Sequence, residues 1–262
     1  MNLITSRDNP LLKDLRRLSQ DSTAYRKLGR VWLEGDHLCR ALLNRGHRPE
    51  HAIFSESAWA HVDPLLSQAA PKNTVLPDAL FQEISSLESA ACMGFVWAFM
   101  RFPEQVPEIQ KGVSSVLLDR IQDAGNVGSI LRSASAFGFT QVLARKGTAA
   151  LWSPKVLRAG MGAHFGLHLV EGLAPEQLHD MQIAWVATSS HQGPFLHTLG
   201  SLEKLPSPCG WIFGHEGQGV SPELAQWASM TVRIAQPGGE ESLNVASAAA
   251  ICLHTSATSA RP

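Results

Sequence analysis

Apolar residues in the first hundred positions switch between helical and strand spacing. In residues 9–18 the leucines recur every three or four positions with basic residues between them, which predicts an amphipathic helix. Short apolar runs predict strands at residues 31–35, 52–54 and 92–98. A helix after the first of these strands should end near Gly46. The alternation of elements predicts a small α/β domain over residues 1–100.

Residues 101–112 contain Pro103 and Pro107 among mixed charges without periodicity, which is typical of a linker. Beyond them, apolar runs separated by helical stretches predict strands at residues 115–118, 141–144, 183–187, 210–213 and 231–234. Strands that alternate with helices favour a mostly parallel sheet covered on both faces. We therefore expect a second α/β domain over residues 113–262, with a frayed tail from residue 255.

The chain of 262 residues has a formal net charge of −1, but the charge is unevenly distributed. Residues 1–50 contain ten Lys and Arg against six Asp and Glu, whereas residues 51–111 contain three against seven. Such a basic N-terminal arm is typical of contact with nucleic-acid phosphates, although a solvated helix face is the alternative. The candidates for that contact are Arg16, Arg17, Arg26 and Lys27.

Neither a secretory leader nor a membrane span is indicated. The first eight residues lack the basic-then-apolar order of a signal peptide, and no run of about 18 apolar residues occurs. The cysteines are scattered without a C-x-x-C pair, which disfavours a zinc site and a disulfide framework. They are Cys39, Cys92, Cys209 and Cys252. We expect a cytoplasmic protein with reduced thiols.

A metal site is not expected either. His164, His168 and Glu171 are spaced as metal ligands can be. However, glycines interrupt residues 160–169, which indicates strand and loop rather than a helix that presents both histidines on one face.

Glycine and polar residues cluster directly after strands of the second domain, and in open α/β sheets ligands bind beyond the carboxyl ends of the strands. In the first turn, Asn126 is expected to be the N-cap of a helix, and Gly138 is expected to follow its end. Arg132 lies off the apolar stripe of that helix and should project from its first turns toward the crevice, where the helix terminus attracts anions. An ordinary solvated arginine is the alternative.

The second turn contains Gly214, Gly217 and Gly219, which let backbone approach a ligand closely. Ser221 after them is expected to be the N-cap of a new helix. The register fits neither G-x-G-x-x-G nor G-x-x-x-x-G-K-[ST], so neither nucleotide-binding fingerprint is present.

The third turn carries Ser242 and Asn244 before a helix over residues 245–253 that is apolar on nearly every side. Such a helix is expected to be buried in the core or in a subunit interface. Taken singly, Ser242 or Asn244 is better explained as no more than the cap of this helix.

In this order, the three turns resemble the three motifs of the SpoU/TrmH ribose methyltransferases, within the SPOUT superfamily. Asn126 and Arg132 have the spacing of motif 1, residues 214–219 resemble motif 2, and residues 242–245 before an alanine-rich helix resemble motif 3. The likeness covers roughly residues 113–255.

Departures from the motifs occur at two places. Ala124 stands where a proline is usual, and Ala235 with Gln236 stands where Pro-Met is usual. In the N-terminal region, residues 4–6, 9–10 and 32–35 are similar to the substrate-binding domain of L30e type that precedes the catalytic domain in many members.

The resemblance implies a C-terminal trefoil knot, a homodimer, and S-adenosylmethionine held in the knot loops. The implied reaction is methylation of a ribose 2′-hydroxyl in a structured RNA, rRNA in preference to tRNA. The implied cofactor-binding residues are Gly214, Gly219, Ile234, Leu243 and Ala246. The implied catalytic residues are Arg132, Asn126, Glu216, Ser242 and Asn244.

Methyl transfer requires an aligned hydroxyl and removal of its proton. Because a guanidinium pKa lies above about 12, we expect Arg132 to clamp a phosphate or hydroxyl rather than to accept that proton. Two rival functions are considered, of which only the first stays open. An RNA-binding scaffold of the same fold would lack catalysis, and an oxidoreductase on a Rossmann sheet is disfavoured because the first strand lacks G-x-G-x-x-G.

Overall fold

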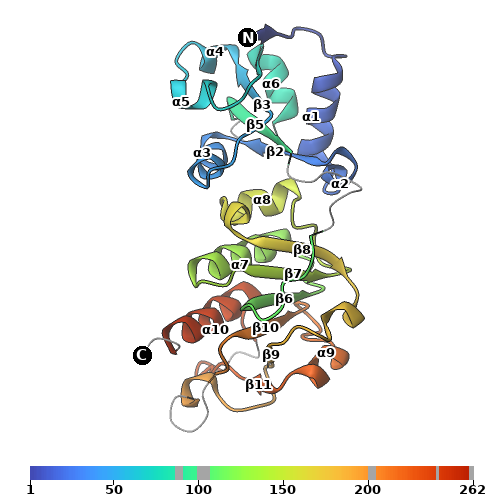
Figure 1. Ribbon diagram of the computed structural model, residues 1–262, viewed down its shortest axis with the longest axis vertical. Coiled ribbons are helices and arrows are strands. Elements are labelled where there is room, and N and C mark those ends of the chain that lie inside the picture. The colour runs from blue at the N-terminus through green and yellow to red at the C-terminus, as the bar shows by residue number, and fades with distance from the viewer. Residues whose placement is uncertain (86–90, 99–106, 200–204, 240–241, 260–262) are drawn as a thin grey trace. The chain divides into compact units, whose positions relative to one another are not determined.

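Strands and helices alternate along the described part of the computed structural model, which comprises residues 1–85, 91–98, 107–199, 205–239 and 242–259. The chain forms two compact units (Figure 1), Met1–Val106 with Trp152–Phe165, and Pro107–Leu151 with Gly166–Pro262. The segment Trp152–Phe165 thus groups with the N-terminal strands, although its residues fall in the second predicted domain. Residues 99–106, which include half of the predicted linker, lie outside the described residues, so the domain boundaries stay predictions.

The N-terminal unit has a mixed sheet with the strand order β1-β4-β3-β5-β2. Its strands are β1 (Asn2–Leu3), β2 (Arg30–Glu34), β3 (His51–Ser55), β4 (Asn73–Leu76) and β5 (Met93–Ala98). Its helices are α1 (Pro10–Gln20), α2 (Ala24–Leu28), α3 (Asp36–Asn44), α4 (Glu56–Trp59), α5 (Pro64–Ser67), α6 (Asp78–Ile84) and α8 (Pro154–Gly160). β1 and β3 run parallel to β4, whereas β5 is antiparallel to β2 and β3. The predicted strands at β2, β3 and β5 are confirmed, while β1 and β4 escaped the sequence pattern.

Helix α1 confirms the amphipathic helix expected near the N-terminus. The Asn9 side chain caps it by accepting a hydrogen bond of 2.9 Å from the Leu11 N–H, and Pro10 occupies its first turn. Leu12, Leu15 and Leu18 are buried, so the basic residues between them face outward.

The C-terminal unit contains a six-stranded sheet with the order β11-β9-β10-β6-β7-β8. Its strands are β6 (Ser115–Asp119), β7 (Gln141–Arg145), β8 (His168–Leu173), β9 (Ala184–Thr188), β10 (Cys209–Gly214) and β11 (Met230–Val232). Its helices are α7 (Ala124–Ala136), α9 (Pro222–Trp227) and α10 (Val245–Ser259). All neighbouring strands pair in parallel, which confirms the predicted parallel sheet.

Helices cover both faces of this sheet, as Figure 1 shows for α7 and α10 on one side and α9 on the other. Along β10, Trp211 donates a hydrogen bond of 2.8 Å to Ser256 of α10. The next residue, Ile212, packs on the opposite face in a cluster with Leu117 and Leu224 of α9. Alternate residues of one strand therefore bury both faces, which explains why the strands were readable as continuous apolar runs.

Several boundaries differ from the predictions. Strand β11 ends at Val232 rather than at residue 234, because Arg233 instead forms an isolated bridge with Phe195. Strand β8 was not predicted as an element of the sheet. The C-terminal helix continues to Ser259, so the described part of the tail is helical and not frayed.

Candidate active site

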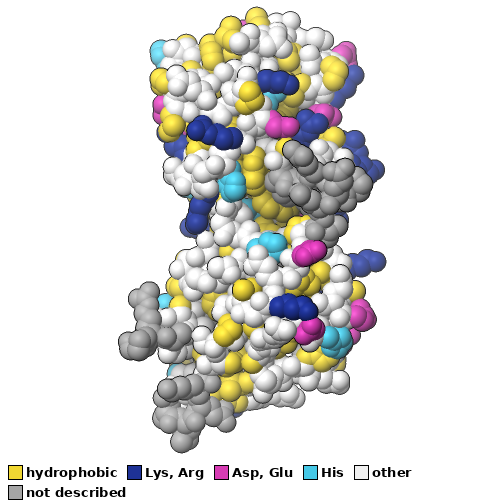
Figure 2. All heavy atoms as spheres, in the orientation of Figure 1, with side chains coloured by type: hydrophobic (Ala, Val, Ile, Leu, Met, Phe, Trp, Pro, Cys, Tyr) yellow, Lys and Arg dark blue, Asp and Glu magenta, His cyan; other side chains and the backbone are white. Residues whose placement is uncertain are grey.

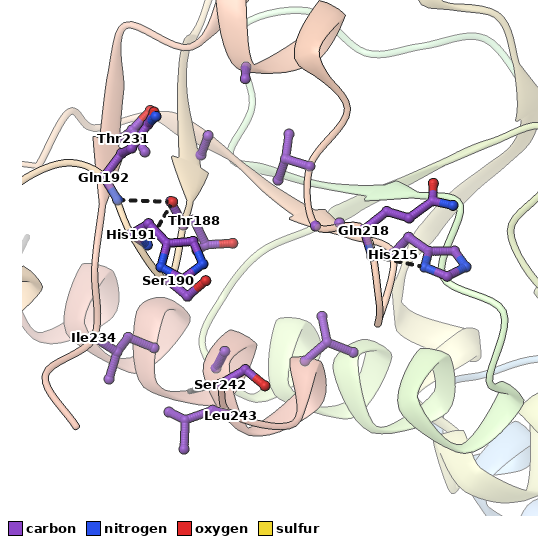
Figure 3. Close-up of a pocket in the computed structure, with 18 of the residues that line it drawn as sticks. Thr188, Ser190, His191, Gln192, His215, Gln218, Thr231, Ile234, Ser242 and Leu243 are labelled. Atoms are coloured by element: carbon purple, nitrogen blue, oxygen red, sulfur yellow. Dashed lines mark hydrogen bonds between the residues drawn. The ribbon is translucent and has the colours of Figure 1, made fainter. Parts of the chain in front are cut away.

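The carboxyl ends of β9, β10 and β11 and the start of α10 enclose a cavity of about 550 Å³. In Figure 3, Thr188, Ser190 and His191 lie on one wall, His215 and Gln218 on the opposite wall, and Ile234, Ser242 and Leu243 close a third side. A cavity of this size at the strand ends of a parallel sheet suits a small-molecule ligand.

Of the residues predicted to hold a cofactor, Gly214, Gly219, Ile234 and Leu243 line this cavity. Ala246 does not line it. The sequence pattern did not reveal the segment after β9, whose residues Thr188–Gln192 form a wall. The Ser189 hydroxyl accepts the backbone N–H groups of His191 and Gln192, both at 3.1 Å, and so folds this loop. A strand end followed by two serines was the available signal for the turn.

The turn after β10 is closed by reciprocal backbone hydrogen bonds between His215 and Gly219, at 3.0 and 2.8 Å. The ring of His215 accepts the Gly217 N–H at 3.0 Å. A Cβ added to Gly214 would lie 2.0 Å from the backbone of Gly219, so this glycine is required by the packing of the turn. Gly219 has φ +68°, and a Cβ there would enter open space. Gly219 therefore fits the expected role of leaving room for a ligand, whereas Gly214 does not.

Glu216 connects the second turn to the first. Its carboxylate accepts the N–H groups of Gln122 and Asp123 at 3.2 and 3.1 Å and the amide of Asn126 at 3.1 Å. Burial raises the pKa of Glu216, but the backbone and Asn126 hydrogen bonds outweigh burial, and the pKa lies below its ordinary value. Glu216 is therefore ionised at neutral pH.

Asn126 and Asn244 bring the first and third turns together, because the Asn244 amide donates to the Asn126 side-chain oxygen at 2.9 Å. The oxygen of Asn244 accepts the N–H of Ala246 at 2.9 Å and so caps α10, as expected. Asn126 itself is not the N-cap of α7. That position belongs to Asp123, which accepts the Asn126 N–H at 2.8 Å, and this frees the Asn126 amide to bridge Glu216 and Asn244.

The structure places Arg132 differently from the prediction. It lies in the third turn of α7, since that helix begins at Ala124, and not in the first turns. Its side chain is exposed, does not line the cavity, and has no hydrogen bond or ion pair with any described residue. Arg132 is thus open to a ligand that approaches from outside.

The four basic candidates of the N-terminal arm differ in availability. Arg16 donates to Glu83 at 2.7 Å and to the backbone oxygen of Arg7 at 3.0 Å, so it ties α1 to α6. Arg17, Arg26 and Lys27 are exposed, but Arg26 is not free, since its guanidinium donates to the Tyr25 hydroxyl at 3.1 Å. On the face drawn in Figure 2, dark blue Lys and Arg side chains are spread over the N-terminal unit.

Among the described residues, no group of three or more His, Cys, Asp and Glu side chains is arranged to hold a metal ion. Glu171 instead accepts the Leu151 N–H at 2.8 Å, and His168 contacts the backbone oxygen of Glu108. None of the helices in the described ranges combines the length and apolarity needed to cross a membrane.

Comparison with known proteins gives relatives over nearly the whole chain. An uncharacterized tRNA/rRNA methyltransferase of Synechocystis is 30% identical over 96% of this chain and 92% of its own length. The 23S rRNA (guanosine(2553)-2′-O)-methyltransferase RlmP of Bacillus subtilis is 27% identical, over 97% of this chain and 98% of its own. A solved rRNA methyltransferase from Sinorhizobium meliloti with AdoMet bound shares the fold, with a TM-score of 0.81 at 24% identity, covering 100% of this chain and 99% of that one.

The family model for the SpoU rRNA methylases matches residues 114–254. That range begins just before β6 and ends within α10, so it contains all three motif turns and every residue that lines the cavity. The chain belongs to the SpoU rRNA methylase family.

Proposed function

We propose that this protein transfers the methyl group of S-adenosylmethionine to a ribose 2′-hydroxyl of structured RNA, rRNA in preference to tRNA. The observation that carries the proposal is the cavity formed by the second and third motif turns at the strand ends. The Bacillus subtilis relative is named as a 2′-O-methyltransferase, and the Sinorhizobium enzyme holds AdoMet. Both favour an enzyme over an RNA-binding scaffold.

The cavity wall fits this cofactor. Ile234 and Leu243 provide apolar surface for a purine, and the open space beside Gly219 admits a ligand close to backbone. Gln236 also lines the cavity, and its side-chain oxygen is buried without a hydrogen-bond partner among the described residues. A buried acceptor of this kind is the complement of the amino group of adenine. When bound, S-adenosylmethionine supplies an electrophilic methyl group on its sulfonium.

The polar side chains around the cavity then orient the RNA. Asn126 is held by both Glu216 and Asn244, so the three turns form one rigid hydrogen-bonded unit beside the cavity. Ser242 presents its hydroxyl at the cavity wall. The exposed guanidinium of Arg132 clamps a phosphate or the ribose hydroxyl, as its planar geometry favours.

Two measurements test the proposed function. Calorimetry should find one S-adenosylmethionine per subunit, and ribose methylation mapped in RNA from cells with and without the protein should differ at a specific 2′-hydroxyl. A protein that binds RNA but neither binds the cofactor nor changes any ribose would instead be a scaffold.

The C-terminal knot and the L30e-type domain are part of the same proposal. The chain leaves edge strand β11 and returns to the middle of the sheet, where α10 packs on α7 and β10, and this return supports a C-terminal trefoil knot. The mixed sheet of the N-terminal unit supports a substrate-binding domain of L30e type. We place the activity in the cytoplasm, with the RNA.

A homodimer is proposed from the surface of α10. Within one chain, only Ala249, Cys252 and Leu253 of this apolar helix are buried, and Ile251 is 41% exposed. Sedimentation should therefore give twice the chain mass of 28.4 kDa. Ile251→Glu should shift the protein toward the monomer, because a charge would be buried in the interface. A wild-type monomer at micromolar concentration would contradict the dimer.

Recruitment of RNA is assigned to the N-terminal arm. Replacing Arg17, Arg26 and Lys27 together with glutamine should weaken RNA binding. Its salt dependence should flatten by up to about 0.9 log units for each phosphate of a duplex that is no longer neutralised. Arg16 is kept, because its ion pair with Glu83 holds α1 in place. The measurement is RNA affinity against salt concentration, with cofactor affinity expected to stay constant.

The matched control is Lys146→Gln, which removes an exposed cation from the catalytic unit. Point variants are preferable to deletion of residues 1–100, since Trp152–Phe165 packs as part of the N-terminal unit and would lose its partners. An unchanged salt dependence of RNA binding in the triple variant would show that the arm is only a solvated helix face.

A further inference from the structure

The carboxyl end of β6 carries a buried carboxylate to which the proposed reaction gives no role. Asp119 has no exposed surface and lies opposite Gly214 in the sheet register. There β10 ends and the turn over residues 214–221 begins, which we call the cofactor turn. A buried charge must be matched by donors, or it destabilises the fold. The described donors to Asp119 are Arg120, Arg145 and the backbone of Ser221.

Arg145 joins Asp119 to the end of the cofactor turn. From the end of β7 it donates to the Asp119 carboxylate at 3.0 Å, to the Ser221 hydroxyl at 2.9 Å and to the Glu223 carboxylate at 3.3 Å. Asp119 also accepts the Ser221 N–H at 2.7 Å. Ser221 is the N-cap of α9, yet its side chain makes no capping hydrogen bond. Its hydroxyl is used to accept Arg145 instead.

Arg120 joins the same carboxylate to the tip of the turn. Its guanidinium donates to Asp119 at 3.1 Å and to the Gln218 side-chain oxygen at 3.2 Å. Arg120 has φ +62°, a conformation that costs free energy for a side chain with a Cβ. The surrounding contacts must hold this conformation, which directs the arginine back toward the carboxylate.

We propose that Asp119, Arg120 and Arg145 are positioning residues that fix the cofactor turn, residues 214–221, in the conformation that binds S-adenosylmethionine. This inference rests on the proposed function. The turn is anchored at its tip through Gln218 and at its end through Ser221, while none of the three charged residues lines the cavity. They act on the cofactor only through the turn, by reducing the ordering that binding requires.

A purely structural role of this cluster would change the melting temperature but not the cofactor affinity of the folded protein. If the cluster only stabilised the sheet, its loss would lower the melting temperature and the active fraction, and the remaining folded molecules would bind cofactor normally. If the cluster positions the turn, folded molecules themselves bind cofactor more weakly, and KM for S-adenosylmethionine rises while kcat at saturation is kept.

The test uses the full chain with Arg145→Met as the main variant and Ser221→Ala as the milder one, which removes a single acceptor of Arg145. Lys146→Met is the control, because it deletes an exposed charge beside Arg145 without any contact with Asp119. S-adenosylmethionine affinity is measured by calorimetry, together with thermal unfolding, KM and kcat on the RNA substrate.

We expect Arg145→Met to raise the Kd and KM for S-adenosylmethionine by about tenfold, Ser221→Ala to raise them by about threefold, and Lys146→Met to change neither. Unchanged Kd in both cluster variants, whatever their melting temperatures, would overturn the inference while wild-type binding keeps the proposed function intact. Absence of cofactor binding in the wild type would instead reject the proposed function itself.

Discussion

Arg132→Ala should lower kcat by on the order of a hundredfold or more, while S-adenosylmethionine binds with unchanged affinity. The separation follows from the position of the residue, because the Arg132 side chain is exposed on α7 and is not part of the cavity wall. Its removal leaves every described interaction of the cavity intact, whereas the proposed clamp on the RNA would be lost. Single-turnover methylation and calorimetry on the same preparation measure the two effects.

Arg132→Lys distinguishes a clamp from a simple positive charge. A planar guanidinium can donate two parallel hydrogen bonds to a phosphate, and an ammonium cannot, so lysine should not rescue turnover. Ser129→Ala, another exposed position of α7, is the control and should retain activity. Substantial activity in Arg132→Lys would remove the argument for a bidentate clamp, and weaker cofactor binding in Arg132→Ala would place the arginine at the cofactor instead.

The strand-end rule made the meeting of three polar residues of the candidate site predictable from the sequence. Glu216, Asn126 and Asn244 are separated by up to 118 positions and still meet through hydrogen bonds, because each follows or faces the carboxyl end of a parallel strand. Their residue types were readable as polar positions between apolar runs. The pattern could not predict which of these side chains caps a helix and which connects the turns.

Local competition between caps explains the wrong assignment at Asn126. Asp123 and Asn126 are both good N-cap residues, and the sequence alone does not decide which side chain closes the helix. In the structure Asp123 caps α7, and Asn126 gains tertiary partners that lie 90 and 118 positions away. Because α7 therefore begins earlier in the sequence than expected, Arg132 lies in its third turn and not in its first turns.

The loop after β9 and the cluster at Asp119 could not be predicted from the sequence, for a different reason. Thr188–Gln192 carries no glycine, so nothing marked it as a ligand wall until the sheet placed it beside β10 and β11. Asp119 and Arg145 end two neighbouring strands, and their meeting depends on register, which apolar runs do not encode. Long-range ion pairs of this kind require the packed structure.

Gly214→Val should abolish both the cofactor turn and S-adenosylmethionine binding. The first side-chain carbon would lie 2.0 Å from the Gly219 backbone and 2.1 Å from the Val220 nitrogen, and backbone cannot yield as a flexible side chain can. We expect a loss of stability of about 3 kcal/mol or more, at the upper end of overpacking costs. Thermal unfolding and calorimetry should both report the change, and a normal melting temperature would show that the turn adapts.

Gly219→Val should instead leave the protein folded and still abolish S-adenosylmethionine binding. At φ +68° a side chain costs about 1–2 kcal/mol of backbone strain, but it meets no described atom within 4 Å and would project into the space beside the cavity wall. Gly138→Val is the matched control, since Gly138 has φ +81° with equally open space and lies at the end of α7, outside the cavity wall. Both variants therefore carry the same kind of backbone strain, but only Gly219→Val places a side chain beside the cavity. Calorimetry should show normal cofactor affinity for Gly138→Val and none for Gly219→Val, whereas equal affinities in the two would move the cofactor away from this turn.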